Sequence, residues 1–157
     1  MESWHELLDL LGPNTNTEGV RRATDDIERL GRDPSTLRAL LPYLEEETNT
    51  RYLMYGAMLL RKVVDRCWSR VRGTEGEEEV KRVLLGLLSG AKNVATRNEC
   101  LDAVDTILLN ATDEGWAGFW GFVEEALESG RTELGFTCMQ VAVIHTPVSQ
   151  FEGLLAG

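Results

Sequence analysis

Apolar side chains recur with the period of an α-helix along almost the whole of this 157-residue chain. Successive stretches place them three or four residues apart, and none shows a convincing alternation of the kind that indicates a β-strand. Stop signals separate the stretches, because Gly31, Gly90 and Gly130 stand where a helix-ending glycine belongs. Asp33-Pro34 combines a capping residue with a proline suited to the first helical position. The pattern therefore predicts an all-α protein.

The predicted helices fall into pairs whose second members recur at intervals of roughly 30 to 45 residues, a period typical of HEAT or armadillo solenoids. One compact eight-helix bundle is the alternative, but a bundle does not require such regular pairing. We predict an all-α, right-handed α-solenoid of about four HEAT-like hairpins, forming a single array over residues 1–157. The second helices are expected to begin near Gly19, Arg51, Thr96 and Thr132. The predicted hairpins cover residues 2–31, 34–71, 75–111 and 113–145, and residues 147–157 begin a fifth.

The charge balance excludes several classes of partner. The chain has 16 basic and 26 acidic residues, for a formal net charge of −10. A protein that binds a phosphate backbone is expected to carry a basic footprint instead. No apolar run approaches the ~20 residues that a membrane span needs, and no signal peptide precedes the first helix. We therefore expect a cytosolic or nuclear protein that binds neither nucleic acid nor membrane.

Catalytic and metal-binding motifs are missing from the sequence. Cys67, Cys100 and Cys138 each lie in a helical pattern, without a CxxC motif or histidines at ligand spacing. Three buried, reduced thiols are the favoured interpretation. There is no glycine-rich phosphate loop, nucleophile elbow or HExxH motif. We expect no enzyme, no metal and no cofactor, since an enzyme or small-molecule binder would need a deep polar pocket that nothing in the sequence predicts.

Four segments between Glu6 and Val71 together resemble one known family, and one of them, Asp33-Pro34 with Leu37 to Leu41, looks like the start of an outer helix. Residues 6–14 read as a short helix ended by a proline-containing turn, and residues 20–30 place two arginines and an alanine before acidic and apolar positions. Residues 57–64 combine a small residue, paired leucines and paired basic residues, and Trp68 closes the helix. In this order and spacing they resemble the amino-terminal HEAT repeats of the importin-β (karyopherin-β) nuclear transport receptors. Beyond residue 72 the likeness is to HEAT pairing in general.

That resemblance implies a fold, partners and a location. Receptors of this family are superhelices of HEAT repeats with their second helices on the concave side, and they have no catalytic residues and no cofactor. Their amino-terminal repeats bind the GTPase Ran in its GTP form, while cargo binds later repeats that this chain lacks. Phenylalanine-glycine nucleoporins bind between outer helices, and the receptors shuttle between cytoplasm and nucleus through the nuclear pore. The alternative is a HEAT-repeat scaffold that binds other proteins without a transport role.

The end of the sequence suggests an incomplete array. A solenoid needs a polar cap on its terminal unit, whereas Phe151, Leu154 and Leu155 are apolar. We therefore expect the chain to be an amino-terminal fragment, or a shortened relative, of a longer protein.

One predicted helix has a net positive charge, although the chain as a whole is acidic. Residues 51–72 hold six basic residues and one acidic residue. On a helical wheel, one face lies opposite the apolar positions and combines arginine and tyrosine, which are enriched at binding hot spots, with an adaptable methionine. The alternative is a solvated face that balances nearby acids such as Glu45 to Glu47. The candidate Ran-binding residues on this face are Arg51, Tyr55, Met58, Lys62 and Arg66.

Two further groups complete the candidate sites. Glu99 and Asp102 lie on the polar side of the next second helix, where they suit basic residues of a GTPase. The alternative for them is the ordinary polar face of an amphipathic helix. Phe119 and Phe122 make the apolar face of their predicted helix wider than packing against one neighbouring helix requires, so they are candidate nucleoporin contacts. The alternative is that they pack against the neighbouring repeat.

Overall fold

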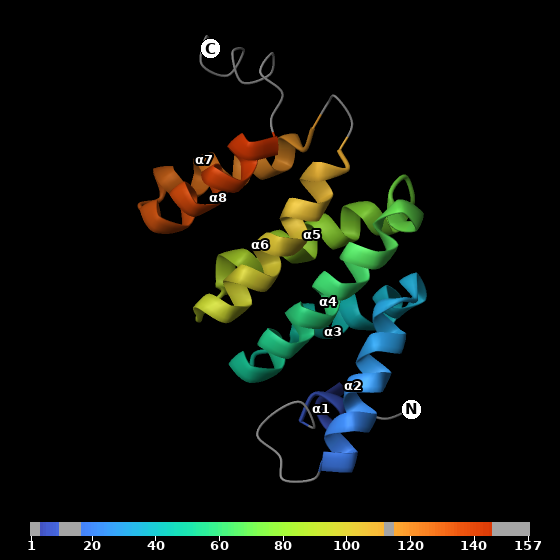
Figure 1. Cartoon of the computed structure of the whole chain (residues 1–157). Coiled ribbons are helices and arrows are strands. Elements are labelled where there is room, and N and C mark those ends of the chain that lie inside the picture. The colour runs from blue at the N-terminus through green and yellow to red at the C-terminus, as the bar shows by residue number, and fades with distance from the viewer. Residues whose placement is uncertain (1–3, 10–16, 112–114, 146–157) are drawn as a thin grey trace. The chain divides into compact units, whose positions relative to one another are not determined.

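All the regular structure in the described part of the chain is helical. The computed structural model describes residues 4–9, 17–111 and 115–145 (Figure 1). The all-α prediction is confirmed for these residues, while the right-handed superhelix and the number of repeats stay predictions. The predicted first residues of two hairpins, 2 and 113, and the predicted start of a fifth hairpin at 147–157 lie outside the described residues. The elements are α1 (Trp4–Asp9), α2 (Thr17–Gly31), the 3-10 helix η1 (Pro34–Thr36), α3 (Leu37–Glu46), α4 (Thr50–Val71), α5 (Glu75–Gly90), α6 (Val94–Leu109), α7 (Ala117–Glu128) and α8 (Thr132–His145).

Local capping explains where these helices begin and end. The Asn49 side chain accepts a hydrogen bond from the backbone N–H of Arg51 at the start of α4, and Thr74 caps α5 in the same way. Gly130 adopts a φ of 85° in the turn between α7 and α8, a conformation that favours glycine. Asp33 caps as expected, but it opens the short η1 turn, so that α3 begins only at Leu37.

The chain divides into two compact units, residues 1–103 and 104–157, and the division falls within α6. In the first unit α2 packs on α4, while α3 packs on both α4 and α5, and α1 packs on α4. First helices of successive pairs, α3 and α5, therefore adjoin each other, as do second helices α2 and α4 (Figure 1). This layered pairing is consistent with an α-solenoid.

A glycine lets the two helices of the α3–α4 hairpin approach closely. A Cβ atom at Gly56 would lie 2.5 Å from Cδ2 of Leu44, closer than real carbon atoms come. Leu40, Leu59 and Leu60 are fully buried in the same unit. The hairpin is thus built on a small residue in α4 facing a leucine of α3.

The second unit is built around the α7–α8 hairpin. A Cβ atom at Gly135 of α8 would lie 2.5 Å from Cδ2 of Leu127 in α7. Phe119 is fully buried, whereas Phe136 and Ile144 of α8 are 51% and 75% exposed. The packed side of this hairpin is therefore well defined, and its other side presents apolar groups.

The three cysteines are free thiols, and each is buried, as the sequence predicted. Burial raises the pKa of Cys100 to about 12. None of the described helices is both long and apolar enough to cross a membrane.

Candidate protein-binding surface

The basic face of α4 is only partly open to solvent. Arg51 and Arg66 are exposed, whereas Tyr55, Met58 and Lys62 are half-buried. The face adjoins α2, because a Cβ atom at Gly31 would lie 3.1 Å from Cβ of Lys62. Those five candidate residues therefore share one helix, but the middle of their face is packed rather than freely solvated.

One carboxylate on α2 serves two cations of α4. Glu28 Oε1 accepts a hydrogen bond from Lys62 Nζ at 2.6 Å, and Glu28 Oε2 lies 2.6 Å from Nη1 of Arg66. The hydrogen bonds from Lys62 and Arg66 lower the pKa of Glu28 to about 2. Two positive charges thus share one negative charge, so the group formed by Lys62, Arg66 and Glu28 has a net positive charge.

The start of α4 is tied to α1. Asp9 forms an ion pair with Arg51 and accepts a hydrogen bond from the Tyr52 hydroxyl at 2.8 Å. The Arg51 guanidinium also lies 5.2 Å from the centre of the Tyr52 ring. Arg51 is therefore held by two neighbours before any partner arrives.

A second contact of α1 involves His5. Its ring stacks on Tyr52 with 4.3 Å between centroids, and its Nε2 lies 2.5 Å from Glu47 Oε2. The hydrogen bond from His5 lowers the pKa of Glu47 to about 2. From the sequence alone His5 is isolated, and neither helical period nor motif spacing signals this contact, because its partner lies 42 residues away.

The acidic candidate Glu99 of α6 forms an ion pair with Arg61 of α4. Arg61 also contacts Asp65 one turn along its own helix, at 3.1 Å. Asp102 is exposed on the same helix as Glu99. The structure therefore places Glu99 in a contact between second helices with Arg61, whereas the basic candidates Lys62 and Arg66 pair with Glu28 of α2.

The solvated-face alternative named the wrong acids. Glu45 pairs with Arg82 of α5 at 2.6 Å, and Glu47 binds His5. The acids that balance α4 are instead Asp9, Glu28, Asp65 and Glu99. The error has a physical cause, since Glu45 at the end of α3 lies against Arg82 of α5, and Glu47, just after α3, lies against His5 of α1.

The two phenylalanine candidates differ in accessibility. Phe119 is fully buried, with its ring centroid 5.4 Å from that of Trp116, while Phe122 is half-buried and stacks on Phe119 at 6.5 Å. These contacts favour packing within the second unit over a direct nucleoporin contact by Phe119. Trp120, one residue after Phe119, is half-buried.

In the first unit, first helices α3 and α5 adjoin each other and second helices α2 and α4 do the same, which is consistent with a helical-repeat protein of α-solenoid type. Over 144 residues the chain is 27% identical to Importin-4 of Mus musculus, and the alignment covers 90% of this chain. The chain spans only 13% of the length of Importin-4. No family model and no solved structure matches. The similarity supports a HEAT region like that of nuclear transport receptors.

Proposed function

We propose that this chain is the amino-terminal part of an importin-β-like transport receptor and that its α4 face binds Ran in its GTP form. The observation that carries the proposal is the 27% identity to Importin-4 along 90% of the chain. The role is binding rather than catalysis, and its setting is the shuttling of receptors between cytoplasm and nucleus. Cargo, and nucleoporins with phenylalanine-glycine repeats, complete the proposed set of partners.

The chemistry of the α4 face suits a protein partner. Tyr55 and Met58 offer apolar contact area to a partner. The tyrosine has few rotatable bonds, so it loses little conformational entropy on binding. Arg66 shares Glu28 with Lys62, so a carboxylate of the partner can pair with Arg66 without stripping Lys62 of its own partner. Because the α2–α4 contacts hold the helix before binding, little ordering is required on association.

The direct test compares Ran in two nucleotide states. Ran loaded with a non-hydrolysable GTP analogue, or with GDP, is immobilised and the 157-residue chain is passed over it. We expect clear preference for the GTP form and a loss of about 30-fold for Tyr55→Ala, the size of a hot-spot truncation. Lys62→Glu should also weaken binding.

Arg38→Glu provides the matched control, because Arg38 is exposed on α3 and the charge change is the same. It should leave binding within about twofold, as expected for a charge distant from the interface. Equal binding of the GTP and GDP forms contradicts the proposal.

A HEAT-repeat scaffold without a transport role is the second candidate. It is favoured by the intramolecular pairing of Arg51, Lys62 and Glu99, which gives these charges a structural use. This candidate predicts partners that are indifferent to nucleotide state, and Lys62→Glu that lowers stability without affecting any binding to Ran.

A further inference from the structure

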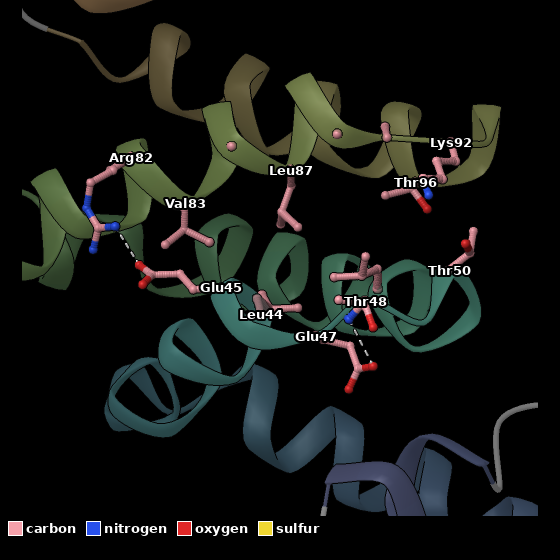
Figure 2. Close-up of a pocket in the computed structure, with 14 residues that line it drawn as sticks. Leu44, Glu45, Glu47, Thr48, Thr50, Arg82, Val83, Leu87, Lys92 and Thr96 are labelled. Atoms are coloured by element: carbon pink, nitrogen blue, oxygen red, sulfur yellow. Dashed lines mark hydrogen bonds and ion pairs between the residues drawn. The ribbon is translucent and has the colours of Figure 1, made fainter.

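A concave pocket of about 540 Å³ lies in the first unit (Figure 2), and its lining includes none of the residues of the Glu28 pairs. Its lining comes from the end of α3, the turn into α4, the second half of α5 and the turn into α6. A volume of this size falls in the range of sites that hold a small ligand or the anchor of a peptide. The pocket is therefore large enough to be considered as a binding site.

One wall of the pocket is apolar and has room beside it. Leu44, Val83 and Leu87 face the space in Figure 2. Gly86 and Gly90 continue the same side of α5, and a Cβ atom at either position would meet nothing within 4 Å. An aliphatic side chain of a ligand can therefore approach the α5 backbone closely while it rests on the three buried side chains.

The other end of the pocket holds an unexplained hydroxyl. Thr96 is only 3% exposed, and its Oγ1 has no hydrogen-bond partner among the residues that the structure describes. A buried polar group without a partner is costly and calls for an explanation. Because Thr96 lines the pocket, a rotation about its Cα–Cβ bond would let a ligand atom there accept the hydrogen bond of its hydroxyl.

Positive charge gathers at the same end. Thr96 lies in the first turn of α6, where its N–H donates to the Asn93 side chain at 2.8 Å, and a helix N-terminus favours an anion. Lys92 is exposed and forms no ion pair with any residue that the structure describes. Figure 2 shows Lys92 and Thr96 at one end of the pocket, with Thr50 on the facing side.

The charges elsewhere in the lining are already engaged. Arg82 pairs with Glu45 at the opposite end, as the dashed line in Figure 2 shows. Glu47 accepts hydrogen bonds from His5 and from the backbone N–H groups of Thr48 and Asn49. An anionic group is therefore expected at the Lys92 end and not at the Arg82 end.

We propose that this pocket binds the carboxyl terminus of a partner polypeptide that ends in an aliphatic residue. The terminal carboxylate lies at Lys92 and Thr96, and the last side chain rests on Leu87, which lies nearer to that end of the pocket than Val83 does (Figure 2). A carboxyl-terminal residue fits because its carboxylate and its apolar side chain leave the same Cα atom. An internal acidic residue uses its side chain for the charge, and its immediate neighbours in an extended peptide point the other way. The proposal does not depend on binding of Ran.

Short peptides test the ligand. The full chain, labelled with ¹⁵N, is titrated with acetyl-Gly-Gly-Leu as the free acid, with its carboxyl amide, and with acetyl-Gly-Gly-Ser as the free acid. We expect the free leucine acid to shift the signals of Gly86, Gly90 and Thr96. Amidation or loss of the aliphatic side chain should each weaken binding by about tenfold or more. Equal binding of the amide, or equal binding of acetyl-Leu-Asp-Gly amide, overturns the proposal.

Variants of the pocket test the geometry. Thr96→Val should weaken the peptide by about fivefold without lowering the thermal midpoint, because it removes a hydroxyl that has no partner in the free protein. Lys92→Gln should weaken it by about tenfold. Arg82→Gln is the matched control at the other end and should change affinity less than about twofold, as expected of a rim charge. Unchanged affinity in Thr96→Val, or a larger loss in Arg82→Gln than in Lys92→Gln, contradicts the proposed orientation.

Discussion

The α3–α4 and α7–α8 hairpins use the same device to bring two helices together. In each, a glycine of the second helix faces a leucine of the first, Gly56 facing Leu44 and Gly135 facing Leu127. A Cβ atom at either glycine would lie 2.5 Å from the leucine. The two hairpins therefore share this one close contact, although α7 and α8 touch more extensively than α3 and α4.

Their other surfaces are different. On α4 the cations meet carboxylates of other helices in the same unit, including Glu28 and Glu99. On α8 the apolar side chains of Phe136 and Ile144 are 51% and 75% exposed. The comparison teaches that the contact inside a hairpin depends on a small residue and a leucine, whereas the surface chemistry of each hairpin is set separately.

The largest expected loss of stability comes from removing the fully buried aromatic ring of Phe119 in the second unit, compared with the half-buried ring of Phe122. Phe119→Ala should lower the free energy of unfolding by about 3–5 kcal/mol, because it empties a fully buried site. Phe122→Ala is the control, since Phe122 is half-buried, and it should cost clearly less. Urea unfolding followed by circular dichroism measures both. Equal costs would show that burial does not distinguish the two rings.

An added methyl group should destabilise both hairpins, and more so at Gly135, where the new Cβ would also lie 2.7 Å from Cγ of Leu127. Gly56→Ala and Gly135→Ala should each lower the free energy of unfolding by about 1–3 kcal/mol, because the new methyl group collides with a leucine. Gly86→Ala and Gly121→Ala are matched controls with nothing within 4 Å of the added Cβ. They should be neutral or stabilising by up to ~1 kcal/mol through helix propensity. If all four variants behave alike, close approach is not the reason for glycine.

Acid should weaken the first unit through two carboxylates. The pKa values of Glu28 and Glu47 are lowered from 4.5 to about 2 in the folded protein. Above pH 4.5 their contribution to stability is fully present, and it is lost as the pH falls toward 2, because the unfolded chain then binds more protons. We expect the thermal midpoint to fall over this window. Glu28→Gln should flatten the fall, and an unchanged slope would contradict the assignment.

The smallest effect on stability is expected on the exposed side of α8. Ile144→Ser should change the free energy of unfolding by no more than about 0.5 kcal/mol, because Ile144 is largely exposed. It should nevertheless reduce any concentration-dependent increase in mass, measured by analytical ultracentrifugation. Gln140→Ser, on an exposed position one turn earlier, is the control and should leave the mass unchanged. An identical mass profile for both variants would mean that this apolar side does not promote association.

Helix positions were predictable because they depend on neighbours in sequence. The second helices were expected near Gly19, Arg51, Thr96 and Thr132, and begin at Thr17, Thr50, Val94 and Thr132. Capping residues such as Asn49 act within one turn, so a linear pattern contains the information.

The contacts of the candidate surface could not be predicted in the same way. The pair of Lys62 with Glu28 joins residues 34 positions apart and depends on how α2 lies against α4. The pocket has the same origin, since Thr96 marked only a helix start and Gly86 carried no motif. Both features need the packing of separate helices, which helical period alone does not specify.

The three buried cysteines can report local opening of the helices that contain them. Cys67, Cys100 and Cys138 lie in α4, α6 and α8, so a thiol reagent can reach each one only when the surrounding helix opens. The raised pKa of Cys100 keeps it almost entirely in the unreactive thiol form while it is buried. The labelling rate at each cysteine, measured by mass spectrometry, would therefore report local opening around that site, without any engineered tag.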